Sequence, residues 1–200
     1  MGLGYNAVLN TEQGFFIDTR KPIVGSVANG VEGVEQAIYS INDTKQTRLL
    51  GGAFIKVTNK QNGSELAPLV FNVTDKATQA EDVNGVLLWA GTDIAEGQGS
   101  LATTQFGLMT RFARLGSRVG VWLEVHSSNV TDLQNANIGI KLTLDAVNGG
   151  VKKADVAGGD TPIAGLTLGS VVMNGQKVVW DNAKSVFKTA EASVVLVYLY

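Results

Sequence analysis

The chain has 200 residues, contains no cysteine and carries a formal net charge of −2 at pH 7. The lack of cysteine excludes disulfides, thiol catalysis and thiolate metal sites, while the length is sufficient for a hydrophobic core. Its 16 basic and 18 acidic residues nearly balance, which argues against a nucleic-acid-binding protein. We expect neither a secretory signal nor a membrane span, because the N-terminus lacks the signal pattern and no apolar run reaches the required length.

Glycine is the most informative residue type, with 24 glycines against three prolines. Asn and Gly tolerate the positive φ angles that tight hairpin turns require. The glycines are scattered among Val, Ile and Thr, so the composition predicts a mainly β protein with many hairpins rather than a low-complexity chain. Asn-Gly pairs begin at Asn29, Asn62, Asn84, Asn148 and Asn174.

Residues 1–50 stand apart from the rest of the chain. They are rich in Gly and Asn and only weakly periodic, so we expect an extended N-terminal arm or an irregular lead-in. Such segments often become ordered only against a partner, and we expect this one to supply much of a partner contact. Within the arm, the apolar side chains of residues 33–41 recur at helical spacing, which indicates one short helix.

The remainder of the chain alternates between apolar and polar residues in several short segments, the pattern of β-strands. A turn at Asn148 joins two of these segments into an expected hairpin, and the apolar end of the chain is expected to lie within a sheet, because a free apolar strand would aggregate. The expected strands cover residues 54–58, 108–114, 119–125, 139–144, 151–154 and 193–200.

A faint internal repeat suggests a division of the chain. Residues 53–58 align with 138–143, and residues 118–123 align with 193–198. Two related β modules, over 51–130 and 131–200, would explain the alignment, although two short-stranded β segments can also align this well by chance. We therefore expect small β-barrel or β-sandwich modules with hairpins, two related modules being one possibility, after an arm at 1–50.

The sequence offers little for catalysis or metal binding. The single histidine, His126, ends an expected strand, and no second ligand lies at a metal-binding spacing. Asp93 and Glu96 lie in a glycine-rich loop, where solvated charges are a better interpretation than paired catalytic carboxylates. Phosphate-loop, dinucleotide and calcium-loop patterns are absent from the sequence. We expect no enzymatic activity, no cofactor and no metal.

Two other residue groups have a functional and a structural interpretation. Arg111, Arg114 and Arg118 cluster around a turn, where they could bind an acidic or nucleic-acid partner. The slightly acidic overall charge favours a solvated strand face with Arg stems over aromatic rings. The tryptophans could be sugar platforms, but their apolar strand contexts favour packing. They are Trp89, Trp122 and Trp180.

Residues 111–123 resemble the strand–turn–strand of bacteriophage head decoration, or structural cement, proteins. In that family a basic turn with glycine precedes a Val-x-Val or Val-Trp-Val strand, as Gly116 precedes Val119–Val125 here. The segments 139–145, 150–154 and 163–166 resemble the family as well, and so does the stretch from Phe54 to Leu87. The resemblance covers about residues 50–200, and its motifs are patterns of strands and turns rather than chemistry.

The resemblance implies a protein that binds the outer surface of the phage capsid and stabilises it. The implied partner is the major capsid protein, with a homo-oligomer such as a trimer, or many copies on a lattice, and without nucleic acid or membrane. Its location would be the virion, after synthesis in the host cytoplasm. The alternatives are a tail or head-fibre protein and a carbohydrate-binding β module. The residues expected to contact the partner are Tyr5, Phe15, Phe16, Arg20, Arg111, Arg114 and Arg118.

Overall fold

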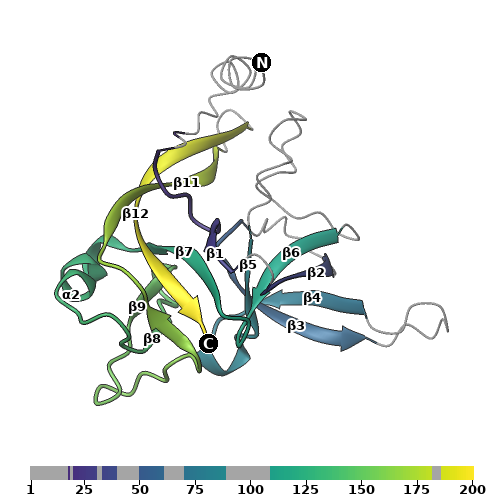
Figure 1. Ribbon diagram of the computed structural model, residues 1–200, viewed down its shortest axis with the longest axis horizontal. Coiled ribbons are helices and arrows are strands. Elements are labelled where there is room, and N and C mark those ends of the chain that lie inside the picture. Colours follow the sequence, from purple (N-terminus) through teal and green to yellow (C-terminus); the bar gives the residue numbers. More distant parts are fainter. Residues whose placement is uncertain are drawn as a thin grey trace.

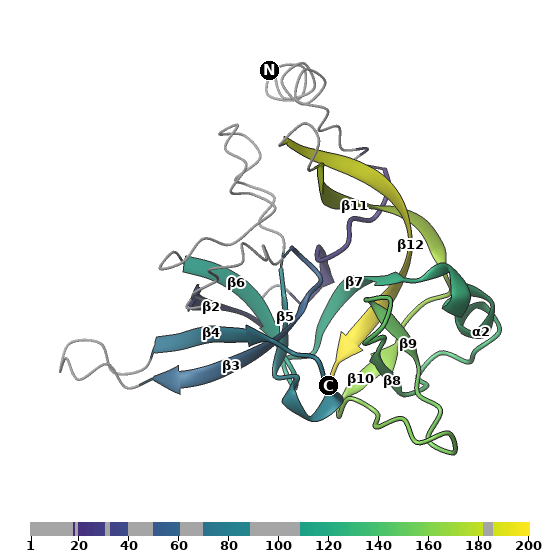
Figure 2. The same ribbon diagram turned by 180° about the vertical axis from the view of Figure 1, so that it is seen from behind.

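The computed structural model describes residues 18, 20–30, 33–39, 50–60, 70–88, 109–181 and 186–200. It is mainly β, as the sequence predicted. The strands form two larger groups that lie side by side, with a two-stranded hairpin beside the second (Figures 1 and 2). Among the residues that the structure describes, no helix has the length and apolar character needed to cross a lipid bilayer.

The first group is a ring of five strands. Their pairing runs β2–β4–β3–β5–β6 and returns from β6 to β2. The β2–β4 pair is parallel and the other pairs are antiparallel. The strands are β2 (Val34–Tyr39), β3 (Phe54–Lys60), β4 (Val70–Lys76), β5 (Gly85–Leu87) and β6 (Met109–Arg114).

The second group is a sheet in the order β1–β7–β12–β10, with β11 paired to another part of β12. The long last strand, β12, therefore pairs with three others (Figure 1). These strands are β1 (Val27–Asn29), β7 (Val119–Val125), β10 (Leu166–Leu168), β11 (Met173–Asp181) and β12 (Val186–Leu199). Beside the sheet lie the hairpin β8 (Leu142–Leu144) and β9 (Val151–Lys153), and short helical segments η2 (Ala80–Asp82), η5 (Ser127–Asn129) and α2 (Val130–Gln134).

One hydrophobic core joins the ring to the second sheet. One face of the ring strands contributes Phe54, Val86 and Ala113 to a cluster that also holds alternate residues of β7 and β12. Alternation follows from the strand geometry, which points successive side chains to opposite faces. The opposite face of the ring strands supports a smaller cluster of four fully or almost fully buried residues. They are Ala37, Ile55, Leu87 and Phe112.

The expected strands are confirmed at β3, β6, β7 and β12, and the hairpin through Asn148 is confirmed as β8–β9. The short helix indicated for residues 33–41 is wrong, because residues 34–39 form strand β2. β2 pairs with β6 in the ring, where Val34 faces the large core and Ala37 the small cluster. Burial on both faces of a strand produces an apolar pattern that resembles helical spacing over a short segment.

Strand pairings connect all three expected parts of the chain, residues 1–50, 51–130 and 131–200. β1 and β2 lie within residues 1–50, yet they pair with β7 and β6, so the expected arm includes two strands of the fold. The repeat-aligned segments 118–123 and 193–198 belong to β7 and β12, which pair with each other in one sheet. The division into two related modules stays a prediction.

The lead-in to β1 is also fixed to the body of the protein. The side chain of Gln176 is buried, accepts a hydrogen bond from the Asp18 amide at 3.1 Å and donates one to the Asp18 carbonyl at 2.6 Å. The backbone of Gln176 bonds to Pro22 and Val24. Gln176 thus holds Asp18 and residues 21–24 along the outer edge of β11.

Glycine permits backbone segments to approach each other where a side chain would not fit. A Cβ on Gly25 would lie 2.4 Å from the backbone of Gly51 and Gly52, and a Cβ on Gly150 would lie 2.2 Å from the carbonyl oxygen of Glu124. Both distances are far below van der Waals contact, so a side chain at either position would force backbone segments apart.

Gly149 and Gly150 allow this steric effect to be measured. Both have positive φ, 84° and 77°, but a Cβ on Gly149 would have no neighbour within 4 Å. Gly149→Ala should lower the free energy of unfolding by about 1–2 kcal/mol, the cost of a left-handed L-residue. Gly150→Ala should cost a further 1–3 kcal/mol or so, because the backbone must move. Urea unfolding of both variants checks this, and equal losses would contradict the close approach.

Candidate functional site

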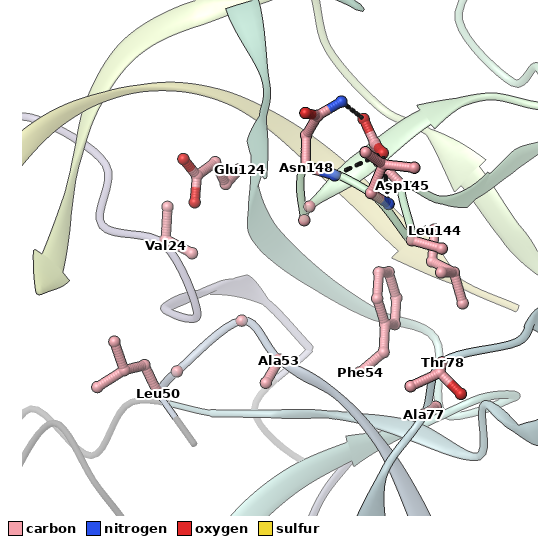
Figure 3. Close-up of a pocket in the computed structure, with 16 residues that line it drawn as sticks. Val24, Leu50, Ala53, Phe54, Ala77, Thr78, Glu124, Leu144, Asp145 and Asn148 are labelled. Atoms are coloured by element: carbon pink, nitrogen blue, oxygen red, sulfur yellow. Dashed lines mark hydrogen bonds between the residues drawn. The ribbon is translucent and has the colours of Figure 1, made fainter. Parts of the chain in front are cut away.

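A pocket of 380 Å³ lies between the ring and the β8–β9 hairpin. Its walls come from the turn before β3 (residues 50–54), from residues 77–78 and from the β8–β9 turn (residues 144–150), with Val24 and Glu124 completing them. Figure 3 shows Phe54, Ala53 and Leu50 on one side and the turn through Asp145 on the other. The volume is within the range of small-ligand pockets, about 300–1,000 Å³.

The β8–β9 turn is organised by a buried carboxylate. Asp145 Oδ1 accepts hydrogen bonds from the amides of Val147 at 3.1 Å and Asn148 at 2.9 Å. Its Oδ2 accepts from the side-chain amides of Asn129 at 2.7 Å and Asn148 at 3.1 Å. Burial raises the pKa of Asp145, but these hydrogen bonds outweigh it and hold the pKa below its ordinary value. The carboxylate therefore stays ionised at neutral pH.

The second carboxylate of the pocket is also engaged. Glu124 on β7 forms an ion pair with Lys177 on β11, across the intervening strand β12. The remaining lining is apolar side chains, glycine backbone, Asn148 and the Thr78 hydroxyl. Both carboxylates have partners in the fold, so the pocket provides an apolar recess with a fixed rim rather than a base positioned beside a nucleophile.

His126 lies outside this lining. Its Nδ1 is 2.9 Å from Ser128 Oγ and accepts a 3.4 Å hydrogen bond from the Ser128 amide, so the ring caps the η5 turn. Polar side chains at the start of a helix commonly cap it in this way, which is a structural role. Among the described residues, no group of three or more His, Asp or Glu side chains could hold a metal ion.

Arg20, one of the expected partner-contact residues, is held in a local ion pair. Its Nε lies 3.0 Å from Asp18 Oδ1 and a terminal guanidinium nitrogen donates to Oδ2 at 3.2 Å. The hydrogen bond from Arg20 lowers the pKa of Asp18, and the same contact raises the pKa of Arg20. The guanidinium remains exposed, so this pair contributes little to stability.

The other three arginines that were expected to contact a partner lie on β6 and in the turn that follows. Arg111 is exposed, while Arg114 is partly buried with its guanidinium 3.8 Å from Glu35. One Glu35 carboxylate oxygen is buried and has no hydrogen-bond partner in the part of the chain that the structure describes. Arg118 is exposed and has a positive φ of 59°.

The structure separates Arg20 from the β6–β7 turn. Lys21, next to Arg20, forms a 2.9 Å ion pair with Glu191 on β12, whereas the Arg118 amide bonds to Leu199 at the end of the same strand. Glu191 and Leu199 are about 26 Å apart along β12, at roughly 3.3 Å per residue. Arg20 and Arg118 therefore do not form one contact surface.

Several expected features fall outside the described residues. They include Tyr5, Phe15, Phe16, Trp89, Asp93 and Glu96. Trp122 is described and lies partly buried on β7, so its role in packing stays a prediction.

Sequence reasoning missed the residues that shape the pocket. Asp145 lies two residues before Val147 in a sequence typical of turns. An Asp at the start of a turn often accepts hydrogen bonds from the amides that follow it, and this tendency is the one local signal of its role. The facing wall, residues 50–54, is brought to it by tertiary packing. A local pattern cannot predict that placement.

Comparisons of the chain with protein-family models, with curated proteins and with solved structures found no match. The functional argument therefore depends on the residues and geometry of this chain.

The Asp145 network predicts a pH-dependent contribution to stability. Asp145→Asn should lower the free energy of unfolding at pH 7 by about 1–3 kcal/mol, because a charged acceptor of buried amides is lost. The folded pKa is below the unfolded value of about 3.9, so the stabilisation is present above that value and disappears as the pH falls through the folded pKa.

Urea unfolding of the wild type and of Asp145→Asn at pH 7 and at about pH 2.5 measures the difference between their free energies of unfolding. This difference should be smaller at the lower pH. Asp132→Asn is the matched control, since Asp132 is exposed on α2. A difference that is the same at both pH values would contradict the proposed role of the carboxylate.

Proposed function

We propose that this chain is a virion structural protein that binds the outer surface of a bacteriophage capsid and stabilises it, without enzymatic activity. The carrying observation is the segment 111–123, which resembles the strand–turn–strand of head decoration proteins. In the fold this segment is β6, an exposed basic turn and β7, and it connects the ring to the second sheet. The turn is exposed at both Gly116 and Arg118, so a partner could reach it.

The pocket and the histidine fit this proposal. The Asp145 and Glu124 carboxylates have partners within the fold, and His126 caps a turn, so each has a structural task. A catalytic site needs a base positioned beside a nucleophile or a metal. The pocket lining supplies an apolar recess instead, which suits the side chain of a partner protein.

Physical linkage explains how such binding would stabilise a capsid. A protein that binds the assembled shell but not the free subunits shifts the equilibrium towards the shell, by an amount that depends on its concentration relative to Kd. If each molecule contacts more than one subunit, modest individual contacts combine into strong binding. The major capsid protein is the proposed partner, and repeated copies on its lattice are the proposed arrangement.

Co-sedimentation with phage heads that lack this protein tests the proposal. We expect saturable binding to assembled heads, weak binding to free capsid subunits, and regular positions on the lattice in electron micrographs. Decorated heads should also release their DNA at a higher temperature than bare heads, because binding stabilises the assembled state.

A different result would identify one of the alternatives. Failure to bind heads, together with rings or tubes formed by the protein itself, would replace decoration with a tail component. Failure of both, together with binding on a glycan array, would replace it with a carbohydrate-binding module. Either outcome would overturn capsid decoration.

A further inference from the structure

Four of the five Asn-Gly pairs of the chain lie within the residues that the structure describes. They begin at Asn29, Asn84, Asn148 and Asn174. Asparagine before glycine is prone to lose its side-chain nitrogen, because glycine has no side chain to shield the backbone amide and lets that amide rotate freely. All four pairs share this chemistry, so the fold determines which of them reacts.

Deamidation begins with attack by the backbone amide that follows the asparagine. The glycine nitrogen bonds to the asparagine Cγ, the Cγ–Nδ2 bond breaks, and Nδ2 leaves as ammonia with the proton of the attacking amide. Water then opens the succinimide ring that has formed. Opening at Cγ gives Asp, and opening at the backbone carbonyl gives isoAsp, in which the chain continues through the side-chain carbonyl. A hydrogen bond from the glycine amide opposes the first step, because that bond must break before the nitrogen can attack.

The fold holds the pairs at Asn148 and Asn84 in place. The Gly149 amide donates a 2.8 Å hydrogen bond to the Asp145 carbonyl, and Asn148 Nδ2 donates to the Asp145 carboxylate at 3.1 Å. Asn84 Oδ1 accepts a 2.9 Å hydrogen bond from the Val57 amide. The glycine that follows Asn84 is buried between β3 and β6. Attack at either pair therefore requires local opening of the structure.

The pair at Asn174 is protected by the β11–β12 ladder. Gln176 directs its backbone N–H and C=O outwards, to the lead-in to β1. Successive residues of a strand direct these groups to opposite sides. The N–H of Gly175 is therefore directed towards Ala192, its partner in register on β12.

The pair at Asn29 lacks this protection. β1 ends at Asn29 and, among the described strands, pairs only with β7. The Gly30 amide donates no hydrogen bond within the part of the chain that the structure describes. Asn29 is exposed, and its side-chain amide donates a hydrogen bond of 3.3 Å to the Tyr198 hydroxyl, which is longer than usual for such a bond.

The backbone requires glycine at position 30. Gly30 has a φ of 77°, and a Cβ at this position would lie 2.8 Å from the Arg118 carbonyl oxygen. A larger residue would have to adopt an unfavourable left-handed conformation and displace the β6–β7 turn. The fold therefore keeps the residue that makes Asn29 reactive.

We propose that Asn29 is a site of spontaneous deamidation in the folded protein, and that the fold protects the other three described pairs. Water is the one co-reactant, and it reaches Asn29 because this residue is exposed. The proposal is independent of capsid binding, since it follows from the backbone hydrogen bonds around each pair.

Deamidation at Asn29 alters the connection between the two strand groups. β1 belongs to the second sheet, and a 2.9 Å bond from the Gly33 amide to the Gly30 carbonyl follows it, just before β2 of the ring. IsoAsp adds one atom to the backbone and so displaces Gly30 from Arg118. Either product carries a carboxylate, which cannot donate a hydrogen bond to the Tyr198 hydroxyl. We expect faster hydrogen exchange in β1 after deamidation.

Mass spectrometry of the digested protein after incubation at neutral pH tests the proposal. Each Asn-Gly pair is followed for the mass change of deamidation and for isoAsp. In the folded protein, Asn29 should react at least about tenfold faster than Asn84, Asn148 and Asn174, because each of these must first open locally.

The same chain unfolded in guanidinium chloride is the matched control. The four pairs should then react at similar rates, because the hydrogen bonds that separate them are lost. In folded Asn29→Gln, residue 29 should stay unmodified, since glutamine requires a larger ring, and the other pairs should react as in the wild type. The hydrogen exchange of β1 should then stay constant during incubation.

Equal rates at Asn29 and Asn148 in the folded protein would overturn the proposal. So would an Asn29 that reacts only in the unfolded chain. A tenfold difference that persists in guanidinium chloride would also overturn it, because the local sequence rather than the fold would then determine the rates.

Discussion

The close approach of backbone segments at glycine is the constraint on which the positions of the turn before β3 and of the β8–β9 turn depend. Gly25 packs against Gly51 and Gly52, and Gly150 against the Glu124 carbonyl, at separations where a Cβ could not fit. These contacts bring the turn before β3 and the β8–β9 turn to opposite sides of one pocket. The high glycine content is therefore a requirement of packing between sheets as well as of hairpin turns.

Much of the secondary structure could be predicted from the sequence, because strand alternation is local. The segments that became β3, β7 and β12 carry β-branched residues at period two, and the Asn148 turn fixes its hairpin. The ring could not be predicted, since β2 joins both β6 and the parallel strand β4 through pairings between distant residues. β2 carries apolar residues at helical spacing because both of its faces are partly buried, so its sequence alone predicts a helix.

For the candidate sites too, the sequence identifies individual residues, whereas their neighbours in space come from distant parts of the chain. Arg118 stood out in the sequence as part of a basic turn, but its left-handed backbone and its bond to Leu199 depend on a strand eighty residues or so away. Tyr198 and Tyr200 belong to an apolar terminal strand that the sequence marks as buried, and pairing with β7 and the turn at Gly165 instead leaves Tyr200 exposed. The sequence identifies Arg118 as an exposed basic residue, and the fold determines which residues lie beside its backbone.

The position of β12 has a consequence for synthesis of the protein. β12 pairs with β7, β10 and β11, so these strands cannot join into one sheet until β12 itself has left the ribosome. The ring strands all precede residue 115 and can associate earlier. A chain whose translation stops before β12 lacks the strand shared by β7, β10 and β11 and the backbone bond from Leu199 that fixes Arg118, so only the ring strands can pair in it.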